Sequence, residues 1–338
     1  MKYTLVVVLT AFIVGCGPAQ NSSKKNQKSN VDYANTITAD DLKEHLYIFA
    51  SDEMQGRMTG SDGQKKAAQY LVDFYKSQEI GAPENASDYF QPIPASYFSR
   101  SRDPKDSENV VAFIKGSEKP EEIIVLSAHY DHVGVDKEGN VYNGADDDGS
   151  GTVSMLAMAQ AFQMAAKEGN GPKRSILFLH VTGEEIGLYG SKYYTDNPLY
   201  PLANTVCNLN TDMIGRIDPD KADNPNYIYL IGSDKLSQEL HDVSEMVNSK
   251  YINLELDYTY NDENDPNRFY YRSDHYNFAK NNIPIIFYFN GVHEDYHKIT
   301  DTPDKIEYEL MAKRAQLIFL TAWEVANREG TITADKLD

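Results

Sequence analysis

Two kinds of apolar pattern alternate along this chain. One is a short run that is almost wholly apolar, and the other is a longer segment with one apolar and one polar face. The short runs have the length of strands, and their lack of alternation is typical of strands buried on both faces of a sheet. They lie at residues 109–116, 123–128, 175–182, 205–214 and 283–289, and a further strand is expected near 252–258.

Between the short runs, apolar residues recur every three to four positions, which predicts helices. The expected helices are residues 40–50, 62–79, 153–166, 187–196, 234–250 and 306–328. Residues 82–108 are rich in Pro, Ser and Tyr without a clear period, so irregular or edge structure is expected there. Strands that alternate with helices predict an α/β fold, a three-layer α/β/α sandwich around a mixed, mostly parallel central sheet.

The N-terminus has a different pattern. Residues 1–16 hold one Lys, then an apolar run that is too short to span a membrane comfortably and that ends at Cys16. This segment resembles a bacterial lipoprotein signal, with residues 1–15 removed and a lipid on Cys16; a plain secretory signal is the alternative. Residues 16–35 are polar and predict a flexible tether. A single folded domain, 36–338, exported and lipid-anchored in the cell envelope, is therefore expected.

Composition narrows the classes of partner. The chain has 338 residues, 41% of them hydrophobic, and a formal net charge of −19. Such an acidic chain is not expected to bind nucleic acid or an anionic surface. Cys207, the other cysteine, lies in an apolar run and is expected in the core, so no intramolecular disulfide forms if Cys16 is lipidated.

Five short motifs carry the candidate chemistry, and each follows an apolar strand or lies in a loop after one. They are AHYDH (128–132), GADDDGSG (144–151), TGEEIGLYGS (182–191), NTDMIGR (210–216) and YHKITDTPDKI (296–306). Ligands bind beyond the carboxyl ends of the strands in such sheets. Together the motifs supply two imidazoles, three carboxylates and one spare carboxylate, which suffices for two divalent cations that share a carboxylate, with a base to activate water.

The first two motifs have alternative interpretations when each is taken alone. His129 follows a strand and suits zinc as a ligand, and Asp131 could either bind metal or orient a ligand histidine. The adjacent carboxylates 146–148 repel one another unless solvated or bound to a cation, so they indicate either a metal site or an exposed acidic turn before a helix.

The later motifs are ambiguous in the same way. Of the adjacent Glu184 and Glu185, one could bind metal and the other act as a general base, although glutamates also favour helix starts. Asp212 and His297 could be ligands or simply polar residues at a strand end and in a surface loop. The remaining histidines exceed the number of ligands needed; His132, His275 and His293 lie near the motifs, His180 is expected in the core, and His45 and His241 fit helix surfaces.

Taken in order and spacing, the motifs resemble those of the co-catalytic zinc aminopeptidases of metallopeptidase family 28. The resemblance covers roughly residues 45–325 and includes the upstream segment FASDEMQGRMTGSDGQKKAAQYL. It implies two Zn²⁺ ions bridged by Asp146. His129 and Asp212 would complete one ion, and Glu185 and His297 the other.

The resemblance also implies roles beyond the ligands. Glu184 would be the general base and acid, Asp131 the partner that orients His129, and Tyr296 a hydrogen-bond donor to the oxyanion. It further implies a cis peptide bond between Asp146 and Asp147. The substrates would be peptides with a free N-terminus, and a monomer is the default expectation, the oligomeric state being left open.

Other activities stay open at this point. A glutaminyl cyclase would use one zinc and tryptophans around its pocket, whereas the sole tryptophan, Trp323, lies in the last predicted helix. A carboxypeptidase or dipeptidase would need a basic clamp for a carboxylate, for which Arg268 or Arg272 could serve. A non-catalytic binding protein would be expected to have degraded ligands. The Tyr-rich stretch 258–276 indicates either a pocket wall or ordinary loop packing.

Overall fold

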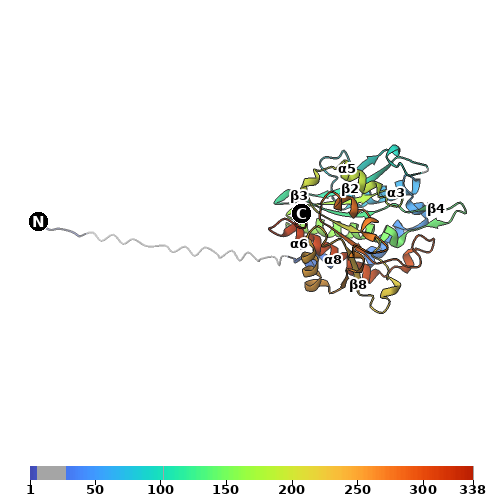
Figure 1. Cartoon of the computed structure of the whole chain (residues 1–338). Coiled ribbons are helices and arrows are strands. Elements are labelled where there is room, and N and C mark those ends of the chain that lie inside the picture. The colour runs from blue at the N-terminus through green and yellow to red at the C-terminus, as the bar shows by residue number, and fades with distance from the viewer. Residues whose placement is uncertain (6–27, 102, 338) are drawn as a thin grey trace.

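The computed structural model describes residues 1–5, 28–101 and 103–337. Within these residues, a mixed sheet forms the centre of the molecule (Figure 1). It has eight strands in the order β1-β2-β6-β3-β7-β10-β8-β9. In that order the strands are Phe90–Ile93, Ser107–Ile114, Arg174–Val181, Lys119–His129, Thr205–Thr211, Ile285–Phe289, Tyr227–Ile231 and Glu255–Asp257. The central strands β6, β3, β7 and β10 are parallel to one another.

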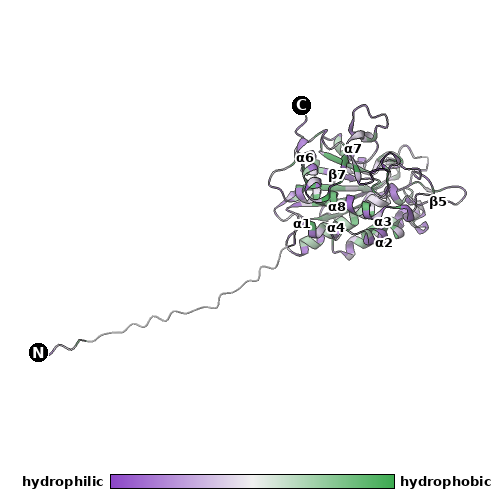
Figure 2. Ribbon diagram, turned by 90° about the horizontal axis from the view of Figure 1, so that it is seen from below, coloured by the Kyte–Doolittle hydropathy of each residue, from purple (hydrophilic) through white to green (hydrophobic). Residues whose placement is uncertain are grey.

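Helices cover both faces of the sheet, which confirms the predicted three-layer sandwich (Figure 2). One layer consists of α1 (Asn30–Ala34), α2 (Ala39–Phe49), α3 (Asp62–Ser77), α4 (Gly151–Lys167), α6 (Gln238–Val247) and α8 (Tyr308–Asn327). The opposite layer holds α5 (Tyr189–Asp196) and α7 (His275–Ala279). A small hairpin of β4 (Gly134–Val135) and β5 (Val141–Tyr142) lies outside the main sheet.

Strand β3 shows why the predicted strands are apolar throughout. Ile123 and Val125 pack into the core on the α5–α7 side, whereas Ile124 and Leu126 pack into the core on the α4–α8 side. Successive side chains of a strand point to opposite faces, so a strand covered on both faces needs apolar residues at every position.

Several elements differ from the sequence-based expectations. The predicted tether 16–35 extends too far, because its last residues form α1, where Tyr33 is fully buried and stacks on Trp323 with ring centroids 5.5 Å apart. Strand β8 was not predicted at all, although Tyr227–Ile231 is wholly buried. The irregular segment 82–108 contains the edge strand β1.

The predicted signal peptide and Cys16 lie, apart from residues 1–5, outside the described residues. Among the described residues, the structure contains no helix whose length and apolar character would suffice to cross a membrane.

Candidate metal centre

The candidate ligands gather where the central parallel strands end. His129 is the last residue of β3, and Asp212 directly follows β7. Glu184 and Glu185 lie in the turn after β6, and His297 lies in the loop after β10. Because these strands run parallel, their carboxyl ends meet at one edge of the sheet, as the motif positions predicted.

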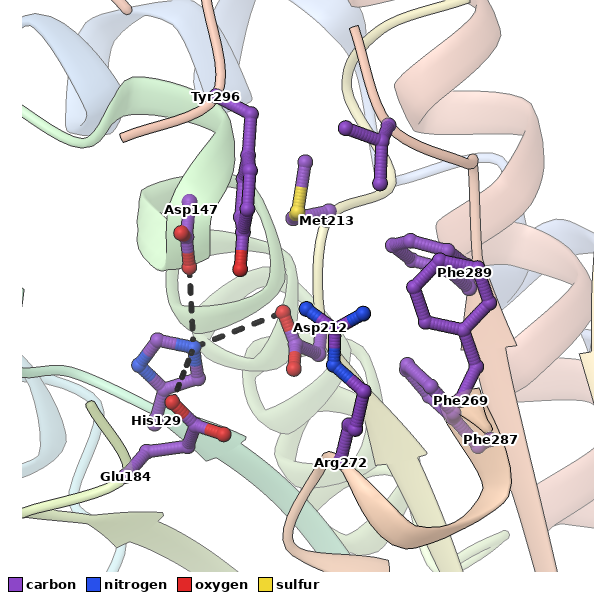
Figure 3. Close-up of a pocket in the computed structure, with 11 residues that line it drawn as sticks. His129, Asp147, Glu184, Asp212, Met213, Phe269, Arg272, Phe287, Phe289 and Tyr296 are labelled. Carbon is purple, nitrogen blue, oxygen red and sulfur yellow. Dashed lines mark ion pairs between the residues drawn. The ribbon is translucent and has the colours of Figure 1, made fainter. Parts of the chain in front are cut away.

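One group of side chains surrounds His129 (Figure 3). Its Nε2 atom lies 3.2 Å from Asp147 Oδ1, 3.5 Å from Asp212 Oδ1 and 3.9 Å from Glu184 Oε2. His129 and Asp147 are buried, and only 12% of the Glu184 side chain is exposed. An imidazole and two carboxylates that converge in this way could hold a metal ion.

A second group lies on the other side of Asp147. His297 Nε2 is 3.0 Å from Asp147 Oδ2 and 3.1 Å from Glu185 Oε2. The buried His132 also faces these carboxylates, with its Nδ1 atom 2.7 Å from Glu185 Oε1 and 3.8 Å from Asp147 Oδ2. His132, Asp147 and Glu185 form a further set that could hold a metal ion, so this histidine is not surplus.

The residue between the two groups is Asp147, which corrects the expectation that Asp146 bridges them. Asp146 points away and accepts hydrogen bonds from the Gly215 N–H at 2.7 Å and the Ser150 hydroxyl at 2.9 Å. Its other oxygen lies 3.1 Å from His293 Nε2. These partners tie Asp146 to the backbone after β7 and to the loop after β10, where it reaches neither group of candidate ligands.

The third aspartate of the run, Asp148, is also structural. Its carboxylate accepts hydrogen bonds from the backbone N–H groups of His129 at 3.2 Å, Gly151 at 2.9 Å and Met213 at 3.1 Å. It thereby joins the ends of β3 and β7. The cis peptide bond is Asp147–Asp148, one residue later than expected. The residue between the two groups and the cis bond therefore both lie one position later in the run of three aspartates than expected.

Other side chains hold the candidate ligands in place. Asp131 accepts hydrogen bonds from the Thr59 hydroxyl at 2.8 Å and the Glu184 backbone N–H at 3.2 Å. Its carboxylate is 3.8 Å from His129 Nδ1, and its backbone oxygen is closer, at 3.1 Å. The Ser273 hydroxyl donates to Asp212 Oδ2 at 2.6 Å. Such partners fix the orientation of metal ligands.

The upstream segment 49–71 supports the centre through the fully buried Arg57. Its guanidinium donates to four backbone oxygens, those of Phe49, Tyr130, Asn143 and Gly144. Tyr130 follows His129, and Gly144 begins the turn that carries Asp147. Arg57 therefore links the two loops that present the candidate ligands.

Asp301 supports the same turn from the other side. Its buried carboxylate accepts hydrogen bonds from the backbone N–H groups of Asp146 and Asp147 at 3.1 and 3.2 Å. Burial raises the pKa of Asp301 to about 6. Asp301 belongs to the fifth motif, and its contact with the second motif could not be predicted from the sequence, because the two motifs lie far apart in the chain.

The electrostatics of the centre favour added positive charge. Burial lowers the pKa of His297, yet Asp147 and Glu185 outweigh it and raise that pKa to about 10. Burial likewise opposes charge on His129, but Asp212 and Glu184 raise its pKa well above the usual value. Buried carboxylates that stabilise positive charge on neighbouring imidazoles this strongly would also favour a bound divalent cation.

Unsatisfied polar atoms point to the same conclusion. Within the described part of the chain, both ring nitrogens of His132, Asp147 Oδ2 and Glu185 Oε1 are buried without a hydrogen-bond partner. His132 and Glu185 approach one another at an angle that makes no hydrogen bond. Buried polar atoms are normally paired, so donor atoms that converge without pairing fit a metal ion between them.

A pocket opens beside the first group of candidate ligands (Figure 3). Its acidic side is formed by three carboxylates together with His129; they are Asp147, Glu184 and Asp212. The rest of its wall is formed by Met213, Phe269, Arg272, Phe287, Phe289, Val292 and Tyr296. The Tyr296 ring stacks on His297 with centroids 3.9 Å apart. Burial raises the pKa of Tyr296, so its hydroxyl keeps its proton at neutral pH.

The two interpretations of the Tyr-rich stretch 258–276 are both partly right. Phe269 and Arg272 line the pocket beside the candidate metal ligands. Tyr260 and Tyr270 line a separate neighbouring hollow together with Arg268. The main aromatic wall of the pocket, Phe287 and Phe289, comes instead from β10.

Fold and site together define an α/β protein in which two His–carboxylate groups share one aspartate at the carboxyl edge of a parallel sheet. The chain belongs to peptidase family M28, because the model of that family matches residues 109–322, more than half of the chain. This confirms the resemblance found from the motifs.

Curated relatives match over shorter stretches. A probable zinc metalloprotease of Leptosphaeria maculans is 36% identical over 135 residues, which are 39% of this chain and 29% of that protein. A vacuolar membrane protease of Emericella nidulans is 30% identical over 146 residues, 43% of this chain and 14% of that protein. The chain thus spans less than a third of the length of these relatives.

Solved structures match over almost the whole chain. The aminopeptidase LapA of Legionella pneumophila has a TM-score of 0.69 at 20% identity, covering 95% of this chain and 81% of its own. The zinc aminopeptidase BSAP of Bacillus subtilis has a TM-score of 0.66 at 15% identity, covering 89% and 99%. At these identities the likeness shows a shared fold.

Proposed function

We propose that the protein is a zinc-dependent aminopeptidase that holds two Zn²⁺ ions and hydrolyses the first peptide bond of peptides with a free N-terminus. The observation that carries this proposal is the position of Asp147. One of its oxygens faces His129 and the other faces His297. Two-metal hydrolases share a carboxylate in this way between ions about 3.5–4 Å apart.

Each ion would have its own ligands besides Asp147. His129 and Asp212 would hold one ion, and Glu185 and His297 the other, with His132 beside Glu185 as a further donor. When bound, zinc would polarise the scissile carbonyl and lower the pKa of a water molecule.

Glu184 is placed to move the protons of the reaction. Its carboxylate is 3.9 Å from His129 Nε2, and no hydrogen bond to another described side chain engages it. It can accept a proton from the attacking water and deliver it to the leaving amine. Burial raises the pKa of Glu184, so an accepted proton is retained until the amine takes it.

Two further residues complete this scheme. The hydroxyl of Tyr296 points toward the acidic side of the pocket (Figure 3) and would donate a hydrogen bond to the oxyanion. Asp131 holds the Glu184 backbone and lies beside His129 Nδ1, so it positions both the base and a ligand. The acidic side of the pocket would attract the free α-amine of the substrate.

The test is hydrolysis of leucine p-nitroanilide and its N-acetyl analogue by the zinc-loaded, full-length protein. We expect chelator-sensitive release from the free-amine substrate only, restored by zinc. Glu184→Gln should lower kcat by about 10²- to 10⁴-fold while two zinc ions per chain are retained. Equal cleavage of the acetylated substrate, or full activity of Glu184→Gln, would contradict the proposal.

An exopeptidase that acts at the C-terminus is the second candidate, because Arg272 lines the pocket and could clamp a terminal carboxylate. Cleavage of N-acetyl dipeptides with a free C-terminus, but not of leucine p-nitroanilide, would favour it.

We also propose that the protein is exported and anchored by a lipid on Cys16, on the sequence of residues 1–16 alone. Labelled palmitate should be incorporated into the protein in a bacterial host, and Cys16→Ser should abolish the labelling. Labelling that survives this substitution would exclude Cys16 as the acceptor.

A further inference from the structure

The pocket wall beside the candidate metal centre contains a positive charge that the proposed aminopeptidase chemistry does not use. Arg272 follows the short helix η8 (Phe269–Tyr271), and it is the one Arg or Lys among the described residues that line this pocket. In Figure 3 its side chain rises along the aromatic wall, and the guanidinium end is directed toward the acidic residues.

Arg272 has no anionic partner within the described parts of the chain. Its guanidinium lies over the Phe269 ring, whose centroid is 4.9 Å from the guanidinium carbon. The buried Arg216 and Arg174 differ in this respect, because Arg216 pairs with Asp295 at 3.0 Å and Arg174 pairs with Glu122 at 2.7 Å. The hydrogen-bond donors of Arg272 are therefore available to a bound molecule.

The surroundings of Arg272 suit a carboxylate. Phe269, Phe287 and Phe289 are at most 6% exposed and form an apolar wall, beside which the exposed Arg272 side chain reaches into the pocket. A guanidinium presents two parallel N–H groups that match a carboxylate. The ring of Phe269 holds the fork in place.

Building on the proposed peptidase function, we propose that Arg272 selects substrates that bring a carboxylate into this pocket. Such a carboxylate has two sources, the acidic side chain of an N-terminal Glu or Asp and the free C-terminus of a dipeptide. The acidic residues of the centre repel such a group, and Arg272, whose guanidinium is directed toward those residues, offsets that repulsion.

Arg268 provides a matched control. It is four residues from Arg272 in the same segment and likewise stacks on an aromatic ring, that of Tyr271, at 4.9 Å. It lines the neighbouring hollow rather than the pocket of the metal centre. Replacing Arg268 with Met removes the same charge from the same segment without changing the pocket wall.

The experiment compares kcat/KM for pairs of substrates that differ only in charge, using the zinc-loaded full-length protein. Glutamyl and glutaminyl p-nitroanilides test the side-chain source, and Ala-Phe and Ala-Phe amide test the C-terminal source. We expect one pair to show a preference for the carboxylate that Arg272→Met reduces by about ten- to a hundredfold. Arg272→Lys should retain part of it, and Arg268→Met should retain all of it.

The outcomes separate this inference from the function on which it rests. Cleavage of neutral substrates with no carboxylate preference, or a preference that survives Arg272→Met, overturns the role of Arg272 and leaves the peptidase proposal standing. If no substrate is cleaved, the peptidase proposal fails, and calorimetry decides on Arg272. The wild-type protein should then bind glutamate more tightly than glutamine, or phenylalanine more tightly than its amide, and Arg272→Met should lose this preference. Equal binding by the wild type and Arg272→Met overturns the inference.

Discussion

The two halves of the proposed metal centre are built from different parts of the fold. The half around His129 and Asp212 lies at the ends of neighbouring strands β3 and β7, where 1% and 11% of these side chains are exposed. The half around His297 lies on loops; its side chain is 39% exposed, and its backbone is left-handed with φ of 55°. The sheet fixes one half, whereas the other depends on how a long loop is held.

This difference has a consequence for metal binding. Ligands that the fold holds in place lose little freedom when an ion binds, whereas ligands on a loop must be ordered. We therefore expect the ion of the strand half to be held more tightly than the ion of the loop half, with Asp147 serving both.

The largest expected effect comes from the shared residue. Asp147→Asn should remove ligand charge from both halves, so zinc content should fall below one ion per chain and kcat/KM by at least about a thousandfold. Metal analysis after gel filtration, together with leucine p-nitroanilide kinetics, measures both the zinc content and kcat/KM.

The matched variant Asp146→Asn should retain two zinc ions. Its free energy of unfolding should be lower by about 3 kcal/mol, because the substitution breaks a buried pair with His293. If Asp146→Asn loses zinc and Asp147→Asn does not, Asp146 is the bridging residue and Asp147 is not.

This pair of variants also marks the limit of what could be predicted from the sequence. The strand-end residues His129 and Asp212 could be placed because buried strands are readily recognised and their carboxyl ends must meet. Within 146–148, three identical side chains leave the register undetermined, since the hydrogen bonds to Gly215 and Met213 that separate their roles come from a distant part of the chain.

The fold shows the same division between local and distant information. The long helices and most of the buried strands could be predicted from the apolar pattern, although the buried strand β8 was missed. Helix α1 could not, because five residues form no marked pattern and the helix depends on Tyr33 packing against Trp323, which is 290 positions away. His132 could be seen as a candidate, but only the arrangement of Glu185 beside it shows that it faces the centre.

The second prediction compares the two halves directly. His297→Asn should release one zinc ion per chain and weaken binding of that ion by at least about a hundredfold, while the other ion is retained. Stepwise removal of zinc by a chelating dye should show a fast phase and a slow phase of equal amplitude in the wild type. Only the slow phase should remain in His297→Asn. Loss of the slow phase instead would place the tighter ion in the loop half.

Acid provides a third test, which separates loss of fold from loss of metal. Burial lowers the pKa values of His180 and His275 to about 3. Below pH 6.5 the unfolded chain binds protons at these residues and the folded chain does not, so stability falls as the pH drops from 6.5 toward 3. At pH 5 the loss is about 2 kcal/mol per histidine.

Urea unfolding of the zinc-free protein at pH 7.5 and pH 5 measures this loss without any contribution from the metal. His180→Phe should remove about half of the pH dependence that the two histidines cause. An unchanged pH dependence in this variant would show that His180 takes up its proton within the folded protein. Zinc release from the two halves should therefore be compared above pH 6.5, where protonation of these two histidines does not destabilise the fold.

The smallest expected effect tests whether the strand half owes its tighter binding to fixed ligands. Ser273 donates to Asp212 Oδ2 at 2.6 Å and itself accepts from the Asn210 side chain at 2.9 Å, so the ligand is connected to β7 through a buried pair of hydrogen bonds. Ser273→Ala leaves every ligand in place but frees one of them. It should weaken zinc binding in the strand half by about tenfold, visible as a faster slow phase with the fast phase unchanged. If the slow phase keeps its rate, hydrogen bonding to Asp212 does not account for the difference, and burial of His129 and Asp147 is left as its cause.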